Sequence, residues 1–123
     1  MSLKIRPHKV KVLEEGPHKG KIVDLKEREV QGKSGPVKYL DCYIQEEKTG
    51  IQMKYGCPLN IGVRLGKPNS KLARLLVNCG IDINKDEVDL SQLKGRTVQF
   101  MVQNEETDRG VFSRILDDTV KKA

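Results

Sequence analysis

The chain has few of the residues that build a large hydrophobic interior. Its 123 residues include no Trp, two Phe and three Tyr, and hydrophobic residues make up 37% of the total. This composition predicts a single domain with a small core. No apolar run approaches the roughly 20 residues needed to cross a bilayer, and no signal-peptide segment is recognisable. We therefore expect a soluble, cytoplasmic protein with no membrane partner.

Residues that commonly bind metals or perform catalysis are also scarce. The three cysteines, Cys42, Cys57 and Cys79, lack the CxxC spacing of zinc sites, and their odd number favours buried thiols over disulfides. No paired-carboxylate or GxSxG motif is present, and residues 31–36 lack the spacing of a phosphate-binding loop. The sequence therefore predicts no metal, no cofactor and no enzymatic activity.

Acidic residues are too few to balance the basic ones, which leaves a formal net charge of +6. Residues 1–38 carry ten Lys or Arg against five Asp or Glu, a net of +5, whereas residues 39–123 carry thirteen against twelve, a net of +1. A regional basic excess suits a surface that binds a polyanion such as nucleic acid. A solvated surface that only maintains solubility is the alternative interpretation of the same charge.

One strongly patterned hairpin stands out in the remaining sequence. Residues 37–45 and 51–57 alternate between apolar and polar side chains, which is typical of half-buried strands, and Glu47–Gly50 supplies the turn. Closing the hairpin with Glu46 opposite Ile51 collects the apolar residues on one face, so the pattern specifies its own register. This register pairs Ile44 with Met53, Cys42 with Tyr55, Leu40 with Cys57, Tyr43 with Lys54, and Asp41 with Gly56.

Residues 18–30, before this hairpin, are predicted to form a long strand that pairs with residues 37–45. Gly20 within this strand would mark a bend or a bulge. Residues 31–36 would form a flexible, basic connection between the two strands. The expected register pairs Leu25 with Cys42 and Val23 with Ile44 on the inner face, and Lys26 with Asp41 and Arg28 with Tyr39 on the outer face.

The second half predicts one helix and two more strands. After a loop over residues 57–69, Asn69 or Ser70 caps a helix that ends at Gly80 and buries Leu72, Leu75, Leu76 and Cys79. Asp89 caps a short turn over residues 90–93, and strands follow at residues 96–104 and 111–116. Apolar residues occupy both faces of the last strand, so its inner face stays open.

This order of elements predicts an all-β protein with one helix. Three strands, a helix and two strands is the order of an OB-fold, a five-stranded Greek-key barrel with the helix between the third and fourth strands. The predicted organisation has a basic N-terminal arm over residues 1–17, the OB-fold domain over residues 18–117 and a charged C-terminal tail over residues 118–123.

Several short motifs follow one another in a recognisable order. They are Glu14–Gly16 with Lys21–Asp24, the strand Val37–Leu40, the helix Leu72–Gly80, and Asp89–Gly95 before a Val/Phe strand and a polar hairpin. Over roughly residues 12–117, the chain resembles a family of small phage-encoded OB-fold proteins taken to be single-stranded-DNA-binding proteins. The resemblance implies single-stranded-DNA binding in replication, recombination or repair, in the host cytoplasm if the protein is phage-encoded.

The polar face of the hairpin is the predicted binding surface. Tyrosines beside lysines on an exposed sheet suit base stacking and phosphate neutralisation with little sequence preference. Ordinary cross-strand pairing on an exposed sheet is the alternative explanation for the tyrosines. The predicted contact residues are Tyr39 and Tyr43 for bases, and Lys21, Lys26, Arg28, Lys38 and Lys54 for phosphates.

Two other classes of partner fit the same sequence. RNA cannot be separated from DNA by any residue pattern here. Alternatively, the domain is an OB-fold interaction subunit that binds other replication or recombination proteins without touching nucleic acid, and Met101 and Phe112 would then lie at the interface.

Overall fold

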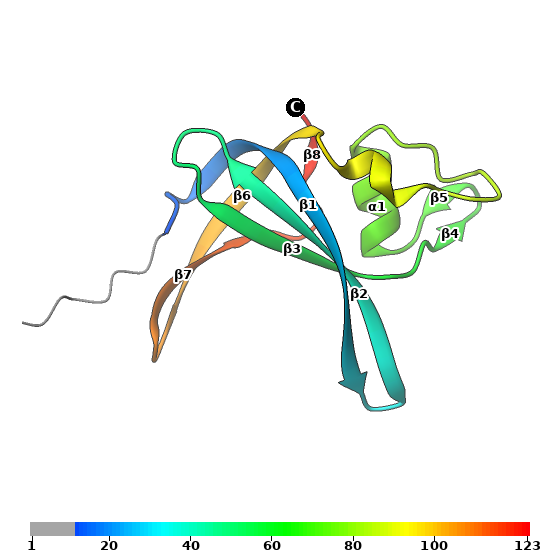
Figure 1. The fold of residues 1–123 in the computed structure, drawn as a ribbon, viewed down its shortest axis with the longest axis horizontal. Helices are drawn as coiled ribbons and strands as arrows, with labels where there is room; N and C mark the ends of the chain where they lie inside the picture. The colour runs from blue at the N-terminus through cyan, green and yellow to red at the C-terminus, as the bar shows by residue number, and fades with distance from the viewer. Residues whose placement is uncertain (1–11) are drawn as a thin grey trace, which may run out of the picture.

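The computed structural model describes residues 12–123, which form a mostly β structure with one α-helix, α1 (Lys71–Asn78). One antiparallel sheet of six strands dominates it, in the order β3-β2-β1-β6-β7 with β8 also paired to β6 (Figure 1). Among the described residues, no backbone pairing joins β3 to β7, so the sheet is not closed. Its strands are β1 (Gly16–Gly32), β2 (Gly35–Glu46), β3 (Gln52–Pro58), β6 (Thr97–Thr107), β7 (Gly110–Ile115) and β8 (Lys121–Lys122).

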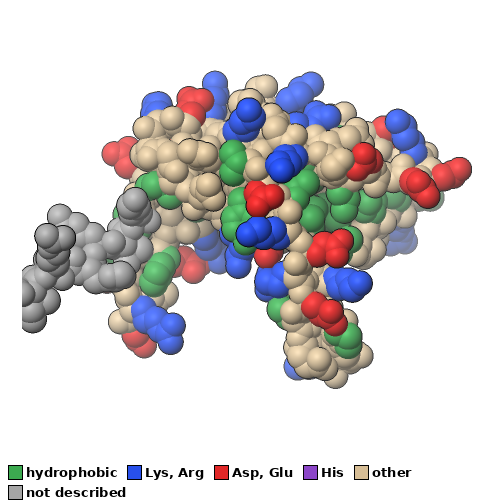
Figure 2. Space-filling model, in the orientation of Figure 1, with side chains coloured by type: hydrophobic (Ala, Val, Ile, Leu, Met, Phe, Trp, Pro, Cys, Tyr) green, Lys and Arg blue, Asp and Glu red, His purple; other side chains and the backbone are tan. Residues whose placement is uncertain are grey.

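Strand β1 is long because it pairs with two different strands. Its first part, Gly16–Lys21, pairs with β6, and its second part, Gly20–Gly32, pairs with β2. Both hairpins, β1–β2 and β6–β7, extend beyond the body of the molecule as arms on the same side of the view in Figure 1. The space-filling view in Figure 2 shows a hollow between these two arms.

The register of the β2–β3 hairpin confirms the prediction, residue for residue, from Leu40 opposite Cys57 to Ile44 opposite Met53. The β1–β2 register confirms the pairs Leu25–Cys42, Lys26–Asp41 and Arg28–Tyr39. The predicted pair of Val23 with Ile44 is wrong, because Ile22 lies opposite Ile44 and a β-bulge separates Ile22 from Asp24.

The bulge lies at Val23 and not at Gly20. An extra residue at this point lets Ile22 and Leu25 both face inward although three positions separate them. Gly20 has a different reason to be glycine, since a Cβ atom there would lie 2.4 Å from the backbone oxygen of Gln45. β1 therefore needs Gly20 for close approach to β2 and the bulge for correct facing of its side chains.

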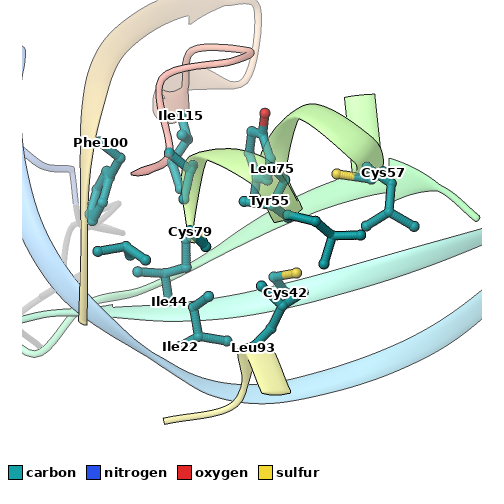
Figure 3. Packing of buried hydrophobic residues seen from close by; sticks show 14 of the residues in the cluster. Ile22, Cys42, Ile44, Tyr55, Cys57, Leu75, Cys79, Leu93, Phe100 and Ile115 are labelled. Atoms are coloured by element: carbon teal, nitrogen blue, oxygen red, sulfur yellow. The ribbon is translucent and has the colours of Figure 1, made fainter. Parts of the chain in front are cut away.

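The core lies between the inner face of the sheet and α1. Figure 3 shows Ile22, Ile44 and Cys42 from the sheet converging with Leu75 from α1, Phe100 from β6 and Ile115 from β7. Tyr55 is buried and its hydroxyl accepts a hydrogen bond from the backbone N–H of Asp118 at 3.0 Å. Of the last strand, Ile115 faces the core, whereas Phe112 is 40% exposed. Ile115 therefore marks the inner face of the last strand, which the sequence left open.

The helix begins where the sequence predicts. Ser70 is its N-cap and accepts a hydrogen bond from the N–H of Ala73, and Gly80 follows its end with φ of 80°. Leu72, Leu75, Leu76 and Cys79 are buried as expected. The predicted turn at residues 90–93 is a 3₁₀ helix, η1 (Leu90–Leu93), capped by Asp89.

Four segments differ from the expected organisation. Residues 31–36 are not a flexible connection, because Gln31 and Gly32 pair with Pro36 and Gly35, which leaves only Lys33 and Ser34 as the turn. Residues 57–69 are not a plain loop, since they contain a small hairpin of β4 (Val63–Arg64) and β5 (Lys67–Pro68). Leu13, in the expected basic arm over residues 1–17, is buried, and β1 already begins at Gly16; residues 1–11 of that arm lie outside the described residues. The expected tail over residues 118–123 contains β8 and buries Val120.

Candidate nucleic-acid interface

The outer face of β1, β2 and β3 gathers most of the predicted contact residues. Because residues opposite each other share a face, the register places alternate side chains of the three strands on the side away from the core. This outer face consists of Lys21, Asp24, Lys26 and Arg28 from β1, Tyr39, Asp41, Tyr43 and Gln45 from β2, and Gln52, Lys54, Gly56 and Pro58 from β3.

An ion pair occupies the centre of the outer face. Arg28 donates from Nε to Oδ2 of Asp41 at 2.8 Å and from Nη2 to Oδ1 at 3.2 Å. Asp41 is only 2% exposed, whereas the Arg28 side chain is 40% exposed. The hydrogen bond to Asp41 raises the pKa of the Arg28 guanidinium.

The glycine opposite this ion pair makes room for it. A Cβ atom on Gly56 would lie 2.8 Å from Oδ1 of Asp41 and 3.5 Å from Nη2 of Arg28. Any side chain at position 56 would therefore push the carboxylate away from its place. The sequence predicted the pairing of Asp41 with Gly56 but not the burial of Asp41.

Each predicted stacking tyrosine has a cation over one face of its ring. The guanidinium carbon of Arg28 lies 4.8 Å from the centre of the Tyr39 ring, and the Nζ of Lys26 lies 5.4 Å from the centre of the Tyr43 ring. Both tyrosines are half-buried. These cation–π contacts hold the rings in place and bring a positive charge onto one face of each ring.

The remaining predicted residues are placed less uniformly. Lys54 lies opposite Tyr43 on the outer face and is exposed, as the sequence predicts. Lys21 also lies on this face, but beyond the bulge, opposite Gln45 and Thr97. Lys38 does not join them, because it shares the alternation of Leu40 and Cys42 and projects on the opposite side of β2.

Sequence reasoning also missed two features of the charge distribution. Residues 48–81 contain six Lys or Arg and no Asp or Glu, so this segment accounts for the whole net charge of +6. Lys19 and Lys121 lie opposite Gln99 from its two sides, which extends the positive outer face onto β6. In Figure 2, the face in view carries basic and acidic side chains intermixed.

A second polar cluster lies at the β2–β3 turn, apart from this face. Glu46 is 2% exposed, and burial alone would raise its pKa. Hydrogen bonds from the Thr49 hydroxyl and from the backbone N–H groups of Lys48 and Thr49 outweigh burial and lower the pKa of Glu46 to about 2. His18 lies 3.7 Å away and adds to this shift. The cluster ties the turn to β1.

The arrangement provides contacts for a ligand but no activated nucleophile among the described residues. All three cysteines are buried, free thiols, as the sequence predicted, and burial raises the pKa of Cys42 and of Cys57 to about 12.

Residues 12–123 include no cluster of three side chains able to hold a metal ion. In the same part of the chain, no helix is long and apolar enough to cross a membrane.

Comparison with known proteins gives no family for this chain. No protein-family model matches the sequence, and no curated protein is significantly similar to it.

Proposed function

We propose that this protein is an OB-fold protein that binds single-stranded DNA through the outer face of β1, β2 and β3, in replication, recombination or repair. The strand order supports the fold assignment. β1 is shared between β2 and β6, α1 lies between β3 and β6 in the chain, and β3 also approaches β7. These are the relations that strands 1 to 5 have in an OB-fold barrel.

The observation that carries the proposal is the pairing of aromatic and cationic side chains across the outer face. Tyr43 has Lys26 beside its ring and Lys54 opposite it on β3, and Tyr39 has Arg28 beside its ring. Rings offer stacking surfaces to any base, and the cations neutralise phosphates, so binding should depend little on sequence and strongly on salt.

The ion pair assigns different roles to the cations. Arg28 is held by Asp41, so its main contribution is a fixed guanidinium plane beside Tyr39 on which a base can stack. Lys26 and Lys54 form no ion pair within residues 12–123, so they are the principal phosphate contacts. Lys38, on the other side of β2, is not part of the proposed surface.

The two projecting hairpins fit the same proposal. In OB-folds, the loops between strands 1 and 2 and between strands 4 and 5 flank the bound strand. Here these are the β1–β2 and β6–β7 hairpins, which extend on the same side of the molecule (Figures 1 and 2). The β6–β7 hairpin carries Glu105 and Glu106 near the end of β6 and Asp108 in its turn, so it would border the path of the strand without contacting many phosphates.

Fluorescence anisotropy with a labelled dT oligonucleotide of about thirty bases tests this function. We expect tighter binding to the single strand than to a duplex of equal length, with a slope of log K against log salt of about −0.7 per phosphate contacted. An rU oligonucleotide of the same length separates DNA from RNA preference. No single-strand binding at low salt would contradict the proposal.

Exposed apolar side chains on β6 and β7 keep the second candidate function open. Met101 is 39% exposed and Phe112 and Val111 are 40% exposed, which suits a protein-binding subunit of a replication or recombination complex. The two functions respond differently to mutation. Tyr43→Ala weakens oligonucleotide binding only if the outer face binds DNA, whereas Phe112→Ala weakens capture of a protein partner only if the β6–β7 hairpin is an interface.

A further inference from the structure

The small β4–β5 hairpin is built against its local preferences. Val63 pairs with Pro68 and Arg64 pairs with Lys67, and the two-residue turn between them, Leu65 and Gly66, has φ of 52° and 75°. A two-residue turn with both φ angles positive strongly favours Asn-Gly. A leucine in the first position is strained, because its Cβ crowds the backbone in the left-handed region.

Among the described residues, no interaction compensates for the backbone strain at Leu65. Leu65 is 94% exposed, the most exposed large hydrophobic residue described, and its neighbour Val63 is 42% exposed. Arg64 and Lys67 lie directly opposite each other, a like-charge pair that destabilises a hairpin. Neither cation forms an ion pair with an acidic side chain in residues 12–123. Local violations of this kind concentrate at functional sites.

The base of the hairpin, by contrast, is held firmly. The Ser70 hydroxyl accepts a hydrogen bond from the N–H of Gly62 at 3.0 Å, donates one to the carbonyl of Asn60 at 2.7 Å and also caps α1. The N–H of Asn69 donates to the carbonyl of Gly62 at 2.7 Å. The exposed tip is therefore presented from a fixed position at one end of the molecule (Figure 1).

We infer that the β4–β5 tip is a second contact for the single-stranded nucleic acid bound on the outer face. Arg64 and Lys67 would each contact a phosphate, and Leu65 would pack against an unstacked base between them. This inference rests on the proposed function. Charge complementarity favours nucleic acid, since the hairpin lies in the acid-free segment 48–81 that also contains Lys54 of the outer face.

The path of the chain connects the two proposed contacts. β3 carries Lys54 and ends at Pro58, opposite Tyr39, and the chain leads directly from there into β4 (Figure 1). A strand that crosses Tyr43 and Tyr39 toward the end of β3 would reach the β4–β5 tip next. A longer oligonucleotide is therefore required to engage both contacts than to engage the outer face alone.

Leu65→Asn separates binding from folding, because Asn-Gly suits this turn better than Leu-Gly. We expect an equal or higher melting temperature, together with about three- to tenfold weaker binding of dT30, the loss of one base contact. A double substitution, Arg64→Gln with Lys67→Gln, should reduce the salt slope by about 1.4, the value for two phosphate contacts on a single strand. Binding of a short dT8 should change little in either variant.

Matched controls come from exposed residues outside the β4–β5 hairpin. Val77→Asn, on the exposed side of α1, and Lys85→Gln, in the loop after it, change apolar and charged surface in the same way and should leave dT30 binding unaltered. If wild-type protein binds dT30 and the hairpin variants bind it equally well, the inference is wrong while the proposed function stands. If the variants lose capture of an acidic peptide but not of dT30, the tip binds protein instead. If wild-type protein binds no single strand, the proposed function fails first.

Discussion

The two faces of β1, β2 and β3 arise from one alternating sequence and have opposite chemistry. The inner face is apolar at its centre, with Cys42 and Ile44 fully buried, and its charged residues, among them Lys38 and Glu46, lie toward the strand ends. The outer face carries Lys26, Lys54 and the tyrosines, and its one buried charge, Asp41, is matched by Arg28. The comparison indicates that inner residues determine stability, whereas most outer residues are free to serve binding.

A truncation on the inner face should have the largest effect on stability. Ile44→Ala removes a fully buried side chain from the centre of the core, so we expect a loss of about 2–5 kcal/mol in the free energy of unfolding. Urea denaturation followed by circular dichroism measures it. A loss below about 1 kcal/mol would mean that this face is less tightly packed than described.

Asp41→Asn should be the most destabilising change on the outer face. It leaves Arg28 without its carboxylate partner, so the loss should lie between that of Ile44→Ala and that of Lys54→Gln. A double-mutant cycle with Arg28→Gln isolates the interaction. Simple additivity of the two single variants would show that the ion pair does not contribute to folding.

Glu46→Gln should destabilise the β2–β3 turn in a pH-dependent way. The pKa of Glu46 is lowered to about 2 in the folded protein, so its carboxylate contributes stability above the unfolded pKa of about 4.3. That contribution is lost as the pH falls through about 2. We expect the variant to be about 1 kcal/mol less stable at pH 7, with the difference shrinking between about pH 4.5 and pH 2. A difference that does not vary with pH would contradict this role of the carboxylate.

The smallest stability effects should come from the proposed contact residues. Lys54→Gln and Tyr43→Ala alter exposed or half-buried side chains, so each should change stability by about 0.5–1 kcal/mol at most. Tyr43→Ala should nevertheless weaken single-strand binding about five- to hundredfold. Lys38→Gln, on the opposite side of β2, is the matched control for Lys54→Gln. Equal binding losses for the two lysine variants would argue against the outer face.

Strand register is predicted most accurately where apolar and polar residues alternate without interruption. The β2–β3 register follows from a strict period of two, because any slip would move apolar residues onto the solvent side. The bulge at Val23 was missed because Ile22, Val23 and Leu25 are all apolar, so either parity fits them. The same alternation excludes Lys38 from the outer face, since Lys38 shares the parity of Leu40.

Other features depend on the folded arrangement and leave little trace in the sequence. Asp41 looks like an exposed residue by alternation, but in the fold it is buried and paired with Arg28 from β1. β8 is two residues long, too short for any periodicity. The acid-free segment 48–81 was readable in the sequence, but its link to the outer face requires the position of β3.

The most direct test of the account is to map the binding surface on the folded protein. Two-dimensional ¹H–¹⁵N NMR spectra recorded during titration with a dT oligonucleotide would report which backbone amides change. We predict that the largest shifts occur at Lys26, Tyr39, Tyr43 and Lys54 on the outer face, with smaller shifts on the β6–β7 hairpin. Shifts that cluster around Met101 and Phe112, or no shifts at saturating oligonucleotide, would contradict the assignment of the outer face as the nucleic-acid interface.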